Sequence, residues 1–546
     1  MRGSVFLQGL ISCLIVAFGQ PSFAPWLSPL AAAFGYALFW RAIRIFPFSK
    51  QRFWRAGVWY SFISLVQLSW MSSIEFQGIY ILFVWLFLSL CLGVQFGLLS
   101  ILIPYNRPLT MARILAMASV WTLLEWSRFH ILCGYSWNLS GMALSVAPAL
   151  QFAALFGILG LSFWVVFVNL LAVRAFLRRG IFHYAIWIGA ALIPYAFGQV
   201  HTLYHERQMA KKENAKDFSC LLVQTGLLPS EKMPLGGRIR SFISPYDQWK
   251  RILTFLQSEG DKGAQLIVLP EAVVPFENGR CVYEREKVEG IFQEVFGKDC
   301  RRDFPSMVAP FGVAGEGRVS NAFWTQTISN LFDSEIVVGL THSEDNGNSY
   351  VSAFHLQPHR EEQERYDKQV LMPLAEYLPS RWLLPLVRSY GVSGFFTRGK
   401  QERVFDGEIP LSVSICYEET FPHIIRQGRR KGAKLLVNVT NDGWYPYSRL
   451  PSQHFEHARL RSVENGAALI RACNTGVTAA IDSLGRTVAK LDECDDQGQI
   501  LAGALFAKFN PYEYFTLYTL WGNWGIVSLS LFFIGIFAFL KKEFRW

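Results

Sequence analysis

Charged side chains are scarce in this 546-residue chain, and they are unevenly distributed. Only 17% of the residues are Asp, Glu, Lys or Arg, whereas 51% are hydrophobic and 45 are Phe. Residues 1–200 and 512–540 are mostly apolar, while residues 201–511 carry most of the charge. This pattern excludes one ordinary domain and favours a membrane protein with an extramembrane domain.

Motifs for metal and nucleotide binding are missing as well. The nine cysteines form no CxxC pair and match no zinc spacing, and no GxGxxG or P-loop pattern occurs. We therefore expect no metal and no cofactor. A net charge of +10 would suit nucleic acid, but many of the basic residues lie in short loops between apolar runs, so we expect no such partner. Cys281 and Cys300 could form a disulfide, and the other cysteines are expected to be mostly buried thiols.

Eight apolar stretches have the length that a membrane-spanning helix needs, about 20 residues. The first could be a signal peptide, since Arg2 precedes it, but Pro25 argues against cleavage after Phe23–Ala24 and favours a retained helix. The eight expected spans lie near residues 4–20, 24–44, 55–72, 79–103, 111–128, 147–174, 181–200 and 514–540.

Basic residues occupy alternate loops between these spans. The intervening loop Ser72–Gly78 contains Glu75 and no basic residue. The basic positions are Arg41, Arg44, Lys50, Arg52, Arg55, Arg107, Arg113, Arg174, Arg178, Arg179, Lys541, Lys542 and Arg545. The positive-inside rule then places the N-terminus in the cytoplasm and residues 201–511 on the outer face. We expect a seven-helix transmembrane domain (1–200), an extracytoplasmic domain (201–511) and a C-terminal transmembrane helix with a cytoplasmic tail (512–546).

One outer loop is unusually rich in aromatic and charged residues. It begins at Glu125-Trp126-Ser127-Arg128 and ends at Gly134-Tyr135-Ser136-Trp137-Asn138. One interpretation is an interfacial aromatic belt with an ion pair, and the other is a surface for lipid headgroups or substrate access.

Residues 218 to about 508 alternate short apolar runs with amphipathic ones, which predicts an α/β domain. Residues 277–333 are expected to be an insertion or a long loop. Strands are predicted at 220–224, 265–269, 335–340, 410–415, 434–439, 467–472 and 478–481, and helices at 245–257, 284–296, 421–431 and 452–465.

Three reactive side chains follow apolar or alternating runs in this domain. Glu271 ends the run Leu266–Pro270, Lys368 precedes the segment Leu371–Pro379, and Cys416 ends a predicted strand. A thiol needs a base to become a nucleophile, and an ammonium group can stabilise a developing oxyanion. A carboxylate in an apolar pocket can carry the proton. Each residue alone would be a surface charge or a core thiol, but together they form a complete set for acyl transfer.

The order Pro-Glu-Ala, Lys-x-x-Leu-x-Pro-x-x-Glu and Ile-Cys-Tyr-Glu resembles the nitrilase (carbon–nitrogen hydrolase) superfamily. With the spans around it, the chain is similar over nearly its whole length to the membrane-embedded apolipoprotein N-acyltransferase family. The resemblance implies an αββα sandwich, a triad of Glu271, Lys368 and Cys416, and supporting roles for Glu376, Tyr417, Glu418 and Trp444. Where the family has Gly and an aromatic residue, this chain has Ala375 and Met233, and residues 277–303 are expanded.

The resemblance also implies the substrates. The acyl donor would be a phospholipid, phosphatidylethanolamine by resemblance, and the acceptor would be the N-terminal S-diacylglyceryl cysteine of an apolipoprotein in the bacterial inner membrane. Lys368 and backbone amides near Tyr417 would stabilise the oxyanion, while Glu376 and Glu418 would orient Lys368 and the leaving headgroup or form structural salt bridges.

Several alternatives stay open. A membrane-tethered amidase would form the same thioester but pass the acyl group to water, and a transporter or scaffold would carry an inactive outer domain. His454, Glu456 and His457 could suggest a metal, although helix packing explains them more simply. A Cys416–His423 protease pair lacks an evident orienting Asn or Asp.

Overall fold

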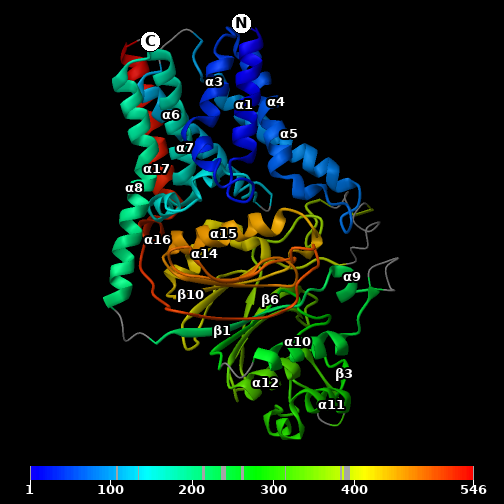
Figure 1. The fold of residues 1–546 in the computed structure, drawn as a ribbon. Helices are drawn as coiled ribbons and strands as arrows, with labels where there is room; N and C mark the ends of the chain where they lie inside the picture. Colours follow the sequence, from blue (N-terminus) through cyan, green and yellow to red (C-terminus); the bar gives the residue numbers. More distant parts are fainter. Residues whose placement is uncertain are drawn as a thin grey trace. The chain divides into compact units, whose positions relative to one another are not determined.

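The computed structural model describes residues 2–105, 109–132, 134–211, 216–234, 241–259, 263–313, 315, 317–380, 384–385 and 394–544. Arg107 and Arg545 of the basic set, and Cys133, lie outside these ranges. The chain divides into two compact units: Met1–Lys212 with Val463–Gly466 and Phe515–Trp546, and Glu213–Ser462 with Ala467–Tyr514. Figure 1 shows a helical first unit and a second unit built on sheets.

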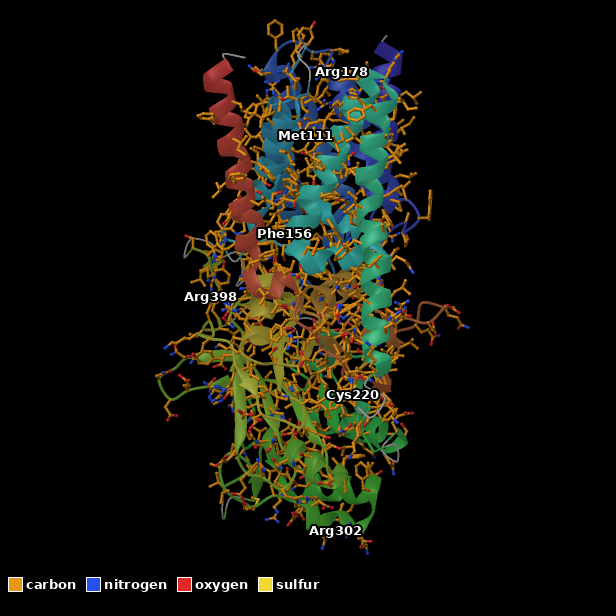
Figure 2. All side chains as sticks on the ribbon, turned by 90° about the vertical axis from the view of Figure 1, so that its left-hand side faces the viewer. Met111, Phe156, Arg178, Cys220, Arg302 and Arg398 are labelled. Carbon is orange, nitrogen blue, oxygen red and sulfur yellow. The ribbon has the colours of Figure 1, made fainter. Side chains whose placement is uncertain are left out.

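Helices make up the first unit, and apolar side chains cover most of them (Figure 2). Within the described ranges, four are long and apolar enough to cross a membrane: Tyr80–Ile101 (α5), Ala149–Arg178, Ile181–Lys211 (α8) and Asn523–Leu540. The second of these combines η4 (Ala149–Phe152) with α7 (Ala153–Arg178), and the fourth lies within α17 (Asn523–Phe544). The other principal helices are α1 (Arg2–Phe18), α3 (Tyr36–Ile43), α4 (Ser49–Gln67), α6 (Met111–Arg128) and α16 (Leu517–Trp521).

Buried polar contacts tie the helices of this unit together. Asn169 of α7 accepts a hydrogen bond from the amide of Ala37 at 3.0 Å and donates to the carbonyls of Ala31 and Ala32. Glu125 and Arg128 of α6 are buried: Glu125 accepts from the Ser140 amide at 2.8 Å and Arg128 donates to Gln95 at 2.7 Å. These two side chains therefore serve helix packing, and their burial argues against an open headgroup surface at their positions.

The second unit contains two six-stranded sheets. The order in the first sheet is β14-β1-β2-β5-β6-β7, formed by Gly503–Phe509, Phe218–Gln224, Leu266–Leu269, Glu335–Ser343, Ser349–Leu356 and Gln363–Asp367. The order in the second is β13-β12-β11-β10-β9-β8, formed by Thr487–Leu491, Thr478–Ile481, Ala468–Cys473, Leu435–Thr440, Leu411–Ile415 and Val404–Phe405. Parallel pairs β1–β2, β2–β5, β9–β10 and β10–β11 form the centre of the sheets.

The two sheets pack face to face, and helices cover their outer faces. Leu222, Val268, Val413, Val437 and Ile470 belong to one buried cluster, which lies between the sheets. A second cluster joins the first sheet to α10 (Pro245–Glu259), α11 (Arg285–Phe296) and α12 (Asn321–Phe332). A third joins the second sheet to α14 (Pro422–Arg430) and α15 (Leu450–Asn465), which lie beside β10 in Figure 1. This αββα sandwich confirms the predicted fold class.

One sequence expectation was wrong. Residues 277–333 are not a simple insertion, because α12 places Phe323, Trp324 and Ile328 in the core with no exposed surface. The polar side chains of this helix, such as Gln326, are buried as well, so its burial could not be predicted from hydrophobicity. Cys281 and Cys300, whose pairing the sequence left open, form no disulfide.

Candidate active site

The three predicted reactive residues follow strands of both sheets. Glu271 follows β2, Lys368 follows β7, and Cys416 follows β9. Parallel strands β2 and β9 end with their carboxyl ends toward these residues, and ligand sites of α/β folds form at such ends. The sandwich thus brings together side chains that are distant from one another in the sequence.

Lys368 lies between two carboxylates. Its Nζ donates to Glu271 Oε1 at 3.0 Å and to Glu376 Oε1 at 2.7 Å, and its side chain is only 1% exposed. Burial alone would lower the pKa of Lys368, but the two carboxylates outweigh it and raise that pKa well above its usual value. The Lys368 side chain is therefore an ammonium group throughout the physiological pH range.

Glu271 and Cys416 lie close enough to influence each other's ionisation. Burial raises the pKa of Glu271, and Lys368 partly opposes this. Burial and then the negative charge of Glu271 raise the pKa of the Cys416 thiol. Burial thus favours the protonated thiol, and it shifts the pKa of Glu271 in the direction that suits a general base.

The backbone of Cys416 is strained. Cys416 has φ +54°, a left-handed conformation that is costly for a residue with a Cβ atom. Cys416 begins the short helix η9 (Cys416–Thr420). The first backbone amides of that helix, including the amide of Tyr417, therefore come directly after Cys416 in the chain. The Tyr417 ring packs edge-on against Phe421, with ring centroids 4.9 Å apart.

Glu418 organises the backbone around two of the three residues. Its Oε1 accepts from the amides of Gln369 and Val370 at 2.5 and 3.0 Å, directly after Lys368. Its Oε2 accepts from the amide of Ile415, directly before Cys416, at 2.8 Å and from the Tyr366 hydroxyl at 2.9 Å. Burial raises the pKa of Glu418 to about 7, and the backbone amides oppose this rise. One buried carboxylate thus links the loops of Lys368 and Cys416.

The role of Glu418 and Glu376 toward a leaving headgroup stays a prediction. Glu376 pairs with Lys368 and also accepts from the Met372 amide at 2.8 Å. Trp444 is half-buried and ends the turn η10 (Asp442–Trp444) after β10.

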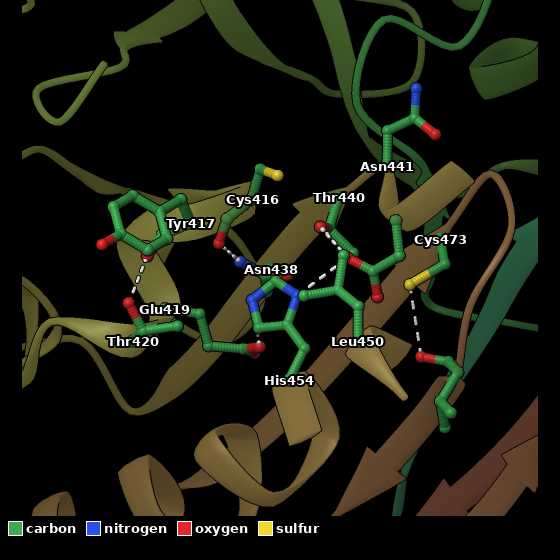
Figure 3. A network of polar contacts seen from close by, with 12 residues as sticks. Cys416, Tyr417, Glu419, Thr420, Asn438, Thr440, Asn441, Leu450, His454 and Cys473 are labelled. Carbon is green, nitrogen blue, oxygen red and sulfur yellow. Dashed lines mark hydrogen bonds and ion pairs between the residues drawn. The ribbon is translucent and has the colours of Figure 1, made fainter. Parts of the chain in front are cut away.

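A buried ionic network lies behind Cys416 (Figure 3). His454 bonds Asp442 at 2.8 Å through Nδ1 and lies 3.3 Å from Glu419 through Nε2. Arg471 pairs with Glu419 at 3.3 Å and with Asp442 at 3.4 Å. Thr440 also belongs to the network, since its hydroxyl donates to Asp442 Oδ1 at 3.4 Å.

The partners of His454 in this network are those of an ion-pair cluster and differ from those of a metal site. Its carboxylate partners and Arg471 make it an ion-pair cluster, and within the described ranges no group of three His, Cys, Asp or Glu side chains could hold a metal ion. His457 is buried, and burial followed by the charge of Arg461 lowers its pKa well below the usual value.

Sequence comparisons place the chain among known proteins. The family model "Apolipoprotein N-acyltransferase N-terminal domain" matches residues 13–171, and "Carbon-nitrogen hydrolase" matches residues 243–502. The apolipoprotein N-acyltransferase of Chlamydia caviae is 33% identical over 97% of this chain and 96% of its own. That of Chlamydia pneumoniae is 30% identical over 98% of this chain and 99% of its own.

Among solved structures, an amidase from Nesterenkonia sp. aligns with 54% of this chain and 92% of its own, at 18% identity and a TM-score of 0.33. The full-length relatives and the two family models agree with the sandwich and with the apolar helices of the first unit. The chain is a membrane protein and belongs to the apolipoprotein N-acyltransferase family, the acyltransferases of the carbon–nitrogen hydrolase superfamily.

Proposed function

We propose that this protein transfers the sn-1 acyl chain of a phospholipid, through a thioester on Cys416, to the amine of an S-diacylglyceryl cysteine at the N-terminus of an apolipoprotein. The observation that carries the proposal is the grouping of the Cys416 thiol with Glu271 and Lys368, which form an ion pair at 3.0 Å, in a member of this family. No cofactor enters the reaction, because an ester is exchanged for a more stable amide.

The first half-reaction acylates the enzyme. Glu271 takes the proton of Cys416 while the sulfur attacks the ester carbonyl of the phospholipid, phosphatidylethanolamine in our proposal. Lys368 and the amide of Tyr417 stabilise the oxyanion that forms. When the ester C–O bond breaks, the lysophospholipid oxygen takes the proton from Glu271, and the acyl group stays on sulfur.

The second half-reaction transfers the acyl group. The α-amine of the diacylglyceryl cysteine attacks the thioester carbonyl, and Glu271 accepts the proton that the amine loses. The C–S bond then breaks, and the proton returns from Glu271 to the sulfur of Cys416. The lysophospholipid leaves before the amine attacks the acyl-enzyme, so the kinetics should be ping-pong.

The basic residues of the short loops support a periplasmic location for this chemistry. Basic residues at Arg41–Arg55 and Arg174–Arg179 favour the cytoplasmic side for those loops. We propose that all seven apolar stretches predicted in residues 1–200 cross the membrane, which would put the catalytic domain on the periplasmic side of the inner membrane, where the acceptor cysteine is expected.

The test is an acyl-transfer assay with purified protein in detergent. We expect phosphatidylethanolamine and a diacylglyceryl lipopeptide to yield a triacylated peptide, lysophospholipid and an acyl adduct on Cys416 by mass spectrometry. C416S should give neither adduct nor product, while the matched variant C494S, at a half-exposed free cysteine, should keep both. Free fatty acid without triacylated peptide would favour the amidase-like hydrolase instead, and full activity of C416S would refute the nucleophile.

A further inference from the structure

Lys232 is a second buried lysine near the candidate base, and the mechanism above does not use it. It ends the short helix α9 (Pro229–Lys232) and is only 3% exposed. Lysine is almost never fully buried unless its amine has partners. The buried amine of Lys232 must therefore have hydrogen-bond partners.

The amine binds the backbone of the base. Lys232 Nζ donates to the carbonyl of Ala272, the residue after Glu271, and to Asn474 Oδ1 at 2.9 Å. Asn474 Nδ2 in turn donates to the carbonyl of Glu271 at 2.6 Å. Lys232 and Asn474 thus hold the carbonyl groups of both Glu271 and Ala272.

The backbone turn at Glu271 and Ala272 is strained and requires stabilising contacts. Ala272 has φ +41°, which is unfavourable for a residue with a side chain. On the other side, the backbone of Gly339 packs closely against that of Glu271, since a Cβ atom at residue 339 would lie 2.5 Å from the Glu271 Cα. The direction of the Glu271 carboxylate therefore depends on a strained turn that the Lys232–Asn474 pair secures.

We propose that Lys232 is a positioning residue for the acyl-transfer reaction: through Asn474 and the Ala272 carbonyl it fixes the turn that aims the Glu271 carboxylate at the Cys416 thiol. This rests on the proposed role of Glu271 as the base. Lys232 also adds a positive charge near Glu271 that the loop of Lys368 does not supply.

The protonation state of Lys232 is compatible with this role. Burial lowers its pKa to about 7, and the charge of Glu271 opposes this. A neutral amine has two N–H groups, and the structure offers two acceptors, so the positioning persists above pH 7. Below pH 7 the ammonium form adds a positive charge beside Glu271, which the charged Lys368 and Glu376 and the neutral Cys416 thiol also face.

The test compares K232M with K434M, a variant of an exposed lysine in the same domain. We expect K232M to lower kcat about 10- to 100-fold, the range that loss of orientation in a catalytic group produces, with KM for the phospholipid unchanged. The rate should be normalised to the folded fraction by gel filtration. The acidic limb of the pH profile should move to higher pH, because Glu271 loses a neighbouring positive charge.

A second variant covers the case in which K232M does not fold. N474D keeps the acceptor for Lys232 but removes the donor to the Glu271 carbonyl, so it should also lose kcat at constant KM. Wild-type kcat and an unmoved pH profile in folded K232M, or wild-type kcat in folded N474D, would overturn the inference. Because C416S is measured in the same assay, a failure of the proposed nucleophile would be seen separately, as product formed by C416S.

Discussion

Removing the Lys368 amine should separate the structural and chemical roles of this residue. In K368M a side chain of similar length and no charge replaces the ammonium group that lies 3.0 Å from Glu271 and 2.7 Å from Glu376. Two carboxylates then face each other in a buried site without a counter-charge. The variant tests whether Lys368 only balances these charges or also acts on the reacting ester.

The structural effect follows from burial. Removing one partner of a buried ion pair costs about 3–5 kcal/mol, because the remaining charge has lost its compensation. For a domain of this size that corresponds to a fall in the melting temperature of roughly 6–20 °C. The chemical effect should be a fall in acylation rate of about 10²- to 10³-fold, the range seen when one oxyanion donor is removed.

The pH dependence has a definite sign. Burial already raises the pKa of Glu271, and removal of the ammonium group raises it further, so the folded variant binds more protons than its unfolded chain near neutral pH. Stability of K368M should therefore increase as the pH falls, more steeply than that of the wild type, where the Lys368 charge opposes the rise in the Glu271 pKa.

A double variant makes the assay decisive. K368M/E376Q removes one of the two unbalanced carboxylates and should recover much of the melting temperature, measured in detergent, without recovering acylation of Cys416. The exposed lysine Lys250, paired with Glu294, provides a control, since K250M should change the melting temperature little. If K368M/E376Q regained both stability and wild-type acylation, Lys368 would have no direct role in the chemistry.

Three further predictions concern the supports of the site. E418Q should lower the free energy of unfolding by about 1–3 kcal/mol, because the new amide cannot accept from every N–H that the carboxylate holds; thermal unfolding at wild-type stability would contradict this. G339A should destabilise the domain and lower kcat, since the new Cβ would overlap the Glu271 backbone; a fully active variant of unchanged melting temperature would exclude that overlap. Wild-type stability should rise between about pH 7 and 10, where Lys232 is neutral only in the folded state, and folded K232M should lack this component of the slope; parallel stability curves would refute a lowered pKa.

Much of the fold could be predicted, because its central strands are continuous apolar runs. The expected strands at 265–269, 410–415 and 434–439 match β2, β9 and β10 within one residue. Strands β6 and β7 were missed, since polar residues such as His355 and Glu364 interrupt their apolar pattern. His355 is nevertheless buried, because Glu335 and Glu364 lie 3.3 and 3.2 Å from its ring nitrogens. Local periodicity does not reveal partners supplied by neighbouring strands.

The site was predictable only in part for the same reason. Glu271 and Cys416 could be identified because each follows a predicted strand, and Lys368 because an ammonium group completes the chemical set of a thiol and a base. Lys232 and Asn474 give no such signal, since they meet Glu271 only through its backbone. The one local sign was the pair Glu231–Lys232 in a short capped helix, where the Glu231 carboxylate accepts from the Leu228 amide at 2.8 Å.

The resting charges of the site explain why the nucleophile needs so many supports. Burial keeps the Cys416 thiol protonated, so the free enzyme does not present a thiolate, and proton transfer to Glu271 must accompany attack on the ester. Such a transfer succeeds only if the carboxylate stays aligned with the thiol as charge moves from oxygen to sulfur and then to the oxyanion. In the proposed mechanism Lys368 stabilises that charge, while Glu418 holds the loops of Lys368 and Cys416, and Lys232 with Asn474 holds the turn of Glu271. Each of the three reacting groups is thus held through its backbone as well as by its side-chain contacts.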